Sequence, residues 1–215
     1  MHIPDGFVSG PVNAATFALS AGAISIALVK ARHEMDDRTV PLLGVCAAFV
    51  FAAQMLNFPV AGGTSGHFLG AVMTGVLLGP WNSCLILGIV LVIQALGFAD
   101  GGITALGSNL FNMGIVGGIV GTYIFYALRW ILPSSRKGFL AAVALASWAS
   151  VVLASASCAL MLAVSGTSPL RVALPAMVGV HALIGVGEAI ITTAVVGAVL
   201  SARSDLVRSW KGGAA

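Results

Sequence analysis

The chain has 215 residues, of which 59% are apolar and only 8% are charged, and its mean hydropathy is +1.04. Soluble domains average about 45–50% apolar and about 25% charged residues, so this composition excludes an ordinary soluble fold and predicts an integral membrane protein. The net charge of +3 comes without a basic run, which excludes a nucleic-acid partner, and three scattered cysteines exclude a disulfide framework.

The first segment, residues 1–10, carries a candidate metal chelate in the motif MHIPDG. The free amine of Met1, the amide nitrogen of His2 and the His2 imidazole can close two adjoining chelate rings on one metal ion, leaving one corner of a plane open. A planar nitrogen set suits Ni(II) or Cu(II) rather than Mg or Ca. The amide must lose its proton to bind, so affinity should fall as the pH drops. The alternative is that the chain start is frayed and has no role.

Seven apolar runs follow, and they predict an all-α protein. A spanning helix needs about 20 residues, within a range of about 17–25, and six runs meet or approach this length. The third run is short, and we expect its helix to extend into the turn before it. Strands are not expected, because the runs are long and do not alternate apolar with polar residues. The predicted fold is a polytopic bundle of seven transmembrane helices, from the runs at 11–29, 41–57, 66–80, 82–99, 108–128, 139–164 and 171–200.

The basic residues predict the orientation of this bundle. With an external N-terminus and seven spans, nine of the ten Lys and Arg residues fall on the cytoplasmic side, and only Arg171 falls outside. This bias satisfies the positive-inside rule, although loss of the third span would invert everything after it. We expect residues 1–215 to form one transmembrane metal-binding domain, with loops 58–66 and 100–107 at the outer face and a cytoplasmic tail at 201–215. The nine residues are Lys30, Arg32, Arg38, Arg129, Arg136, Lys137, Arg203, Arg208 and Lys211.

Uncharged amides and one loop acid gather at the predicted outer face. These residues are Asn57, Gln94, Asp100 and Asn109. Asn57 and Asn109 also have a plainer explanation as helix caps, and Asp100 has one as part of a turn.

The last apolar run contains two ionisable residues, His181 and Glu188. They are seven residues apart and therefore share one helix face. Ionisable side chains are costly inside a membrane span, which makes them functional candidates. The alternative is a buried polar pair that ties the last helix to its neighbours.

His67 completes the candidate metal site. It follows the glycine-rich loop 58–66 and, by the predicted topology, lies at the same membrane face as His2. Its imidazole can take the fourth corner of the plane that Met1 and His2 leave open. The glycines before it permit the close backbone approach that such a site requires.

With these residues in view, the chain resembles the CbiM/NikM family, the substrate-binding membrane components of energy-coupling-factor (ECF) transporters for nickel and cobalt. The resemblance implies that Met1, through its amine, and His2, through amide and imidazole, bind the metal together with His67. It also implies seven helices with the N-terminal segment tucked into the bundle, in a prokaryotic cell membrane. The matching motifs are MHIPDG at 1–6, NFPVAGGTSGHFLG at 57–70, QALGFADGGITALGSNLFNMG at 94–114 and HALIGVGEAIIT at 181–192.

The resemblance further implies protein partners. Family members work with a second membrane subunit, the T component, and with paired cytoplasmic ABC ATPases, often with a small accessory membrane protein. This chain contains no Gly-x4-Gly-Lys-Ser/Thr motif, so we expect it to be a transport subunit and not an enzyme. A stripe of small residues on the first helix, at Ala14, Ala18 and Gly22, is a candidate contact with another membrane protein.

The predicted substrate is Ni(II), because four in-plane nitrogens with a deprotonated amide favour it over the usually octahedral Co(II). Co(II) supplied for cobalamin synthesis is the alternative, and Cu(II) would bind such a site at least as well. We expect some of Asn57, Gln94, Asp100, Asn109, His181 and Glu188 to hold the tautomer and angle of a ligand histidine. Two alternatives belong to other classes of function. One is a stand-alone channel or secondary transporter, which needs a polar path across the membrane. The other is a metalloprotease, whose HExxH motif is absent from this sequence.

Overall fold

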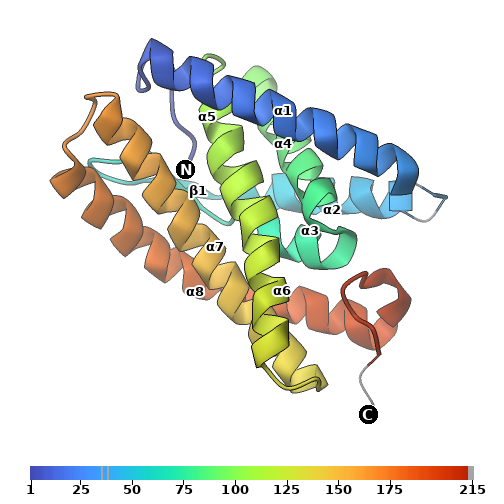
Figure 1. The fold of residues 1–215 in the computed structure, drawn as a ribbon. Coiled ribbons are helices and arrows are strands. Elements are labelled where there is room, and N and C mark those ends of the chain that lie inside the picture. Colours follow the sequence, from blue (N-terminus) through green and yellow to red (C-terminus); the bar gives the residue numbers. More distant parts are fainter. Residues whose placement is uncertain (35, 38, 213–215) are drawn as a thin grey trace.

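The computed structural model describes residues 1–34, 36–37 and 39–212 and consists mainly of long packed helices (Figure 1). Arg38 and the last three residues of the predicted tail lie outside this range. In chain order the elements are α1 (Gly10–Glu34), α2 (Thr39–Gln54), β1 (Asn57–Pro59), β2 (Ser65–His67), α3 (Ala71–Leu78), α4 (Pro80–Phe98), α5 (Leu106–Leu110), a π-helical stretch (Phe111–Val120), α6 (Gly121–Ile131), α7 (Arg136–Val164), α8 (Leu170–Ala202) and a 3-10 turn (Ser204–Leu206).

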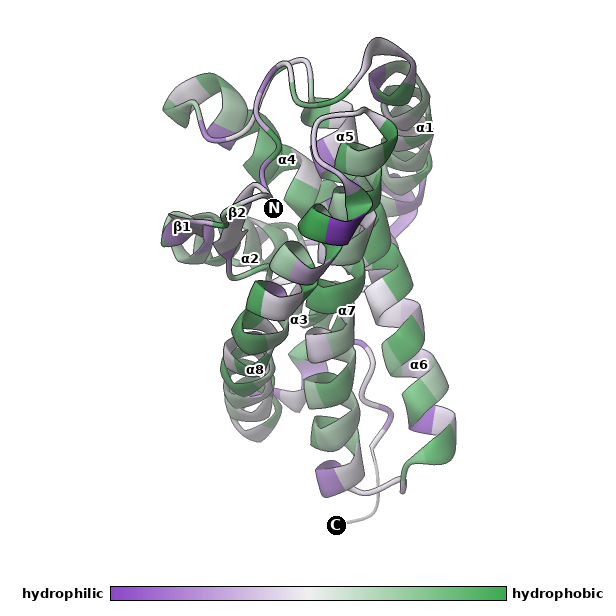
Figure 2. Ribbon diagram, turned by 90° about the vertical axis from the view of Figure 1, so that its left-hand side faces the viewer, coloured by the Kyte–Doolittle hydropathy of each residue, from purple (hydrophilic) through white to green (hydrophobic). Residues whose placement is uncertain are grey.

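Five helical segments of the described chain are long and apolar enough to cross a membrane. They are α1, α4, the continuous helix over 106–131, α7 and α8. Large apolar side chains such as Phe17, Leu183 and Ile190 are exposed on their outer surfaces. Apolar residues cover most of the length of these helices (Figure 2). The chain is therefore a multi-pass membrane protein, as predicted, whereas the count of seven spans stays a prediction because α2 has only 16 residues.

The third apolar run differs from the expected helix. α3 covers only Ala71–Leu78, eight residues that rise about 12 Å, and His67 lies in strand β2, which pairs antiparallel with β1. The expectations of a helix extending into the preceding turn and of a fold without strands are therefore wrong here. The helix does not continue back through Gly70, which takes a left-handed φ of 74°.

Glycines let the helix over 106–131 pack closely against its neighbours. A Cβ on Gly117 would lie 2.8 Å from Leu69 Cδ2, and one on Gly121 would lie 2.7 Å from Ser150 Cβ. These close approaches make the glycine-bearing face of this helix a packing surface.

Basic residues of the described chain gather at one end of the bundle. Arg208, after α8, donates to the Glu34 carboxylate at the end of α1 at 2.5 and 3.0 Å, and Lys30 lies 4.6 Å from the Trp81 ring centre. Just after the C-terminal end of α7, Thr167 donates to the carbonyl of Phe7 in the N-terminal segment. The clustering agrees with the expected charge bias, and which end faces the cytoplasm stays a prediction.

Candidate metal centre

The N-terminal segment enters the helix bundle and is buried there (Figure 1). Met1 and Ile3 are completely buried. The side chain of Asn109 accepts from the Ile3 N–H at 2.7 Å and donates to the Ile3 carbonyl at 3.1 Å, while the Gly102 N–H donates to the same carbonyl at 2.8 Å. Asn109 and the loop after α4 therefore hold the first residues in one position inside the protein.

The Met1 amine and the His2 amide nitrogen both face Ser65. The amine donates to the Ser65 carbonyl at 2.6 Å and to its hydroxyl at 2.9 Å, and the His2 N–H donates to the same hydroxyl at 3.0 Å. Ser65 is in β2, two residues before His67, so the hairpin brings two predicted donors next to the third. Burial lowers the pKa of the Met1 amine to about 5, against the opposing effects of Cys158 and Asp100. The amine is therefore neutral at pH 7, with its lone pair available.

The imidazoles of His2 and His67 lie side by side, with ring centroids 4.6 Å apart and planes tilted by 31°. His67 Nδ1 is 2.6 Å from the Phe68 carbonyl, which can only accept, so Nδ1 carries the proton and Nε2 keeps its lone pair. His67 Nε2 and both His2 ring nitrogens are buried without a hydrogen-bond partner among the described residues. Buried polar atoms are normally paired, so these nitrogens point to a ligand.

Both rings are held in the neutral form that binds metal. Burial lowers the pKa of His2 to about 3, with a smaller contribution from the neighbouring amine. Burial also keeps the pKa of His67 well below its usual range. Neutral imidazole is the form that ligates a metal ion.

Asp100 lies on the far side of the His2 ring. Its Oδ2 is 3.7 Å from His2 Nε2 and accepts from the Asn57 Nδ2 at 2.9 Å. Burial raises the pKa of Asp100, while the nearby amine and the Asn57 amide lower it. A carboxylate next to Nε2 favours the proton on that nitrogen and leaves Nδ1 free. Nδ1 is the ring nitrogen that can close a chelate ring with the amide of the same residue.

Glu188 holds the loop that follows His67. Its carboxylate, buried in α8, accepts from the Leu69 N–H at 2.7 Å and from the Gly70 N–H at 2.8 Å. On the other side of this loop, Gln54 donates to the Leu69 carbonyl at 2.9 Å and accepts from Gln94 at 3.2 Å. Glu188 and Gln94 therefore act on the position of His67, Gln94 through Gln54.

His181 lies on the same buried face of α8 as Glu188, but it does not bind the loop that follows His67. Its Nδ1 is 2.7 Å from the Met177 carbonyl, so Nδ1 is protonated, and Nε2 is buried without a partner within the part of the chain that the structure describes. No hydrogen bond between described atoms joins His181 to Glu188, and the two residues bind different partners. Glu188 instead ties α8 to a neighbouring loop.

The sequence prediction lacks two residues. Ser65 contacts the predicted site directly, and Gln54 holds the loop that follows His67. The sequence signal that could have identified Ser65 is a hydroxyl two residues before a candidate ligand histidine. Gln54 is an amide within an otherwise apolar run, which is the kind of residue that marks a functional position in a membrane helix.

Side chains alone do not build a metal site in the described residues. No group of three His, Cys, Asp or Glu side chains among them converges to hold an ion. A site at His2 and His67 therefore depends on backbone nitrogens for its remaining donors, and the Met1 amine and His2 amide are the ones present. A hollow of about 640 Å³ opens beside them, and both Asp5 and Asp100 line it, which favours the approach of a cation.

Known proteins resemble this chain over nearly its whole length. Residues 2–206 match the CbiM family, described as cobalt uptake substrate-specific transmembrane region. A putative metal transport protein of Haloquadratum walsbyi is 44% identical, covering 96% of this chain and 93% of its own. A putative fused nickel transport protein of Archaeoglobus fulgidus is 40% identical over 96% of this chain and 68% of its own. The cobalt transport protein CbiM of Sorangium cellulosum is 32% identical over 96% and 94%.

Solved structures agree with the fold. The crystal structure of a transition metal transporter superposes with a TM-score of 0.86 at 33% identity, covering 94% of this chain and 93% of the other. A truncated transition metal transporter gives a TM-score of 0.87 at 34% identity, over 94% and 99%.

Proposed function

This chain belongs to the CbiM family of cobalt uptake substrate-specific transmembrane proteins, and from that premise we propose that it captures Ni(II) as the substrate of an ECF-type importer. The resemblance inferred from four sequence motifs is thereby confirmed, and the protein is a multi-pass cell-membrane component of nickel or cobalt transport. The finer assignments of metal, ligands and mechanism are the proposal.

The observation that carries the proposal is the set of buried nitrogens at the N-terminus. The proposed donors are the Met1 amine, the His2 amide and Nδ1, and His67 Nε2. The two ring nitrogens lie in neighbouring imidazoles and have no hydrogen-bond partner among the described residues, while the amine and amide share one contact at Ser65. The proposal requires a free Met1 amine.

Four nitrogens of this kind favour a planar complex. Two adjoining chelate rings place the amine, amide and Nδ1 close to one plane, and His67 supplies the fourth corner. Deprotonated amide nitrogen is a strong-field donor, which suits square-planar Ni(II). Relatives carry both nickel and cobalt in their names, so Co(II) is the alternative substrate.

Transport by this subunit needs an energy source from other chains. We propose a T component and cytoplasmic ABC ATPases as partners, with a small accessory membrane protein in some assemblies. The support is family membership, together with the absence of a P-loop motif from the sequence.

An insertion tests the N-terminal chelate. One proline inserted between Met1 and His2 puts a tertiary amide nitrogen, which has no proton to lose and cannot bind, between the amine and the His2 amide. The two adjoining chelate rings can then no longer close, so Ni(II) affinity, measured by isothermal titration calorimetry on purified protein, should fall by orders of magnitude. The matched control is one proline inserted after Gly6, which leaves both chelate rings unchanged. Equal affinity of the two insertion variants and wild type would exclude the amine and amide as joint ligands.

A further inference from the structure

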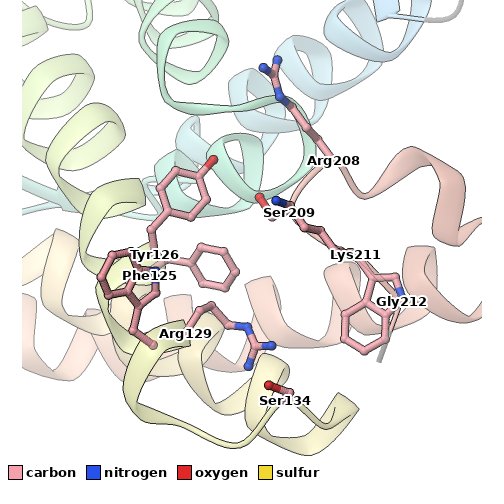
Figure 3. Close-up of a pocket in the computed structure, with 10 residues that line it drawn as sticks. Phe125, Tyr126, Arg129, Ser134, Arg208, Ser209, Lys211 and Gly212 are labelled. Carbon is pink, nitrogen blue, oxygen red and sulfur yellow. The ribbon is translucent and has the colours of Figure 1, made fainter. Parts of the chain in front are cut away.

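A second hollow lies at the end of the molecule where the basic residues gather, and its chemistry differs from that of the metal site (Figure 3). It measures about 580 Å³ and lies between the end of α6 and the segment that follows α8. None of its described lining residues is acidic. The side chains that carry the argument are Tyr126, Arg129, Ser134, Ser209 and Lys211.

The wall of this hollow is a fixed aromatic stack. Phe139 packs edge-on against Phe125 at 5.3 Å and against Trp210 at 5.0 Å, and the Arg129 guanidinium lies 5.4 Å from the Phe139 ring centre. The Ser209 N–H donates to the Val76 carbonyl at 3.2 Å, which holds the C-terminal segment against α3. The hollow is therefore built from several elements of the fold.

Two cations and three hydroxyls remain for a ligand. The Arg208 guanidinium points out of the hollow (Figure 3) and binds the Glu34 carboxylate. Its positive charge is therefore paired and is not counted for a ligand in the hollow. Arg129 uses Nη1 to bind the Pro133 carbonyl at 3.0 Å, which orients the rest of its guanidinium beside Ser134. The Ser209 hydroxyl is buried and has no partner within the described chain. A guanidinium, an ammonium and hydroxyl donors together match a phosphate group.

The surface beside the hollow is apolar and faces outward from α6. Tyr123 and Trp130 are seven residues apart on one helix face, and Trp130 is 92% exposed. Ile131 is also exposed. Trp and Tyr at a membrane boundary mark the level of the lipid headgroups.

We propose that this hollow binds the phosphate of an anionic membrane lipid whose acyl chains lie along the exposed face of α6. Arg129 and Lys211 supply the charge, and Ser134, Ser209 and Tyr126 supply hydroxyl donors. Basic pockets between membrane helices are suited to acidic headgroups. The site is separate from the metal centre, and the inference does not depend on which metal is carried.

Native mass spectrometry of the full chain in detergent tests the proposal, with phosphatidylglycerol and phosphatidylcholine added at equal concentration. Wild type should retain phosphatidylglycerol preferentially. The double variant Arg129→Gln/Lys211→Gln should lose roughly thirtyfold in phosphatidylglycerol affinity, the order expected for two interfacial charges. The control Lys137→Gln/Arg171→Gln removes the same charge outside the hollow and should bind like wild type.

Several outcomes would overturn the proposal. Equal retention of the two lipids by wild type, or equal losses in the two double variants, would mean that the hollow does not recognise a headgroup. Displacement of phosphatidylglycerol by inorganic phosphate, with phosphate bound in its absence, would assign the site to a soluble anion instead. Unchanged Ni(II) affinity serves as the folding control for each variant, and Arg129→Lys/Lys211→Arg, which keeps both charges, should retain the lipid.

Discussion

At the scale of single residues, one carboxylate faces the His2 ring on the side away from the proposed ligand nitrogen. Asp100 faces His2 Nε2 at 3.7 Å and is itself held by Asn57 at 2.9 Å. Gly101 lets the same loop pass close to the other ring nitrogen, since a Cβ there would lie 3.3 Å from His2 Nδ1 and its φ is 92°. An anion at this position also offsets the positive charge that a bound divalent ion brings into a buried site.

Asp100→Asn should therefore weaken Ni(II) binding by about tenfold to a hundredfold, the usual cost of losing such a partner. The amide oxygen keeps an acceptor for Nε2–H, so the loss reports mainly the charge. Isothermal titration calorimetry measures the affinity, and Asp205→Asn, at the other end of the molecule, is the matched control. An affinity within a factor of two of wild type would contradict this role for Asp100.

The four proposed nitrogen donors predict how Ni(II) binding depends on pH. Because the pKa of the Met1 amine is lowered to about 5, the amine has no proton to lose above that pH, and only the His2 amide proton must leave. Affinity should then fall about tenfold per pH unit from pH 7 to 5.5 and more steeply below pH 5. Calorimetry in buffers with different ionisation enthalpies counts the protons released, and a count of zero would rule out amide ligation.

At the scale of elements, α8 holds the loop next to the candidate metal centre through one residue. Glu188 binds two consecutive N–H groups of the loop after His67, and it does so from within a helix that crosses the membrane. Gln54 and Gln94 hold the opposite side of that loop from α2 and α4. The position of His67 is thus set jointly by three helices.

Glu188→Gln should lower both stability and Ni(II) affinity. A glutamine can accept only one of the two N–H bonds, and the loss of a charged, buried acceptor costs about 1–3 kcal/mol. Thermal unfolding in detergent measures the stability, and calorimetry measures the affinity. The control Glu34→Gln breaks the Arg208 pair at the other end, so it should leave Ni(II) affinity unchanged; equal metal binding in both variants would show that Glu188 is only structural.

The sequence predicted the membrane class, the long helices and the juxtaposition of His2 with His67, because hydropathy and charge bias act over whole segments. It failed at the hairpin, where three-residue strands carry no periodic signal. The start of α3 was also beyond prediction, since Glu188, 118 positions away from Gly70, sets it by binding backbone N–H groups. Ser65 and Gln54 were missed because their roles come from tertiary contacts with residues distant in sequence.

At the scale of the whole molecule, α1 presents a surface that the fold itself does not use. Its buried residues are Thr16, Ser20, Ala23, Ala27 and Ala31, whereas Ala14, Ala18 and Gly22 are exposed on a different face. A Cβ on Gly22 would meet no other atom within 4 Å. The stripe therefore stays a candidate contact with the proposed T component.

Ala18→Leu should impair assembly with the membrane partner while leaving Ni(II) affinity unchanged, because a larger side chain keeps two close-packed helices apart. Co-purification of the affinity-tagged partner measures assembly. Ala141→Leu, at an exposed alanine of α7, is the control. Normal recovery of the partner with Ala18→Leu would place the contact elsewhere.

The buried amine of Met1 restricts which N-terminal modifications the polypeptide can carry. A formyl or acetyl cap would convert that nitrogen into an amide, and it would add atoms to a residue that is completely buried. Under the proposed ligand set, removal of any cap is an activation step, so inhibiting deformylation should silence metal capture in newly made copies. For the same reason an affinity handle belongs at the C-terminus.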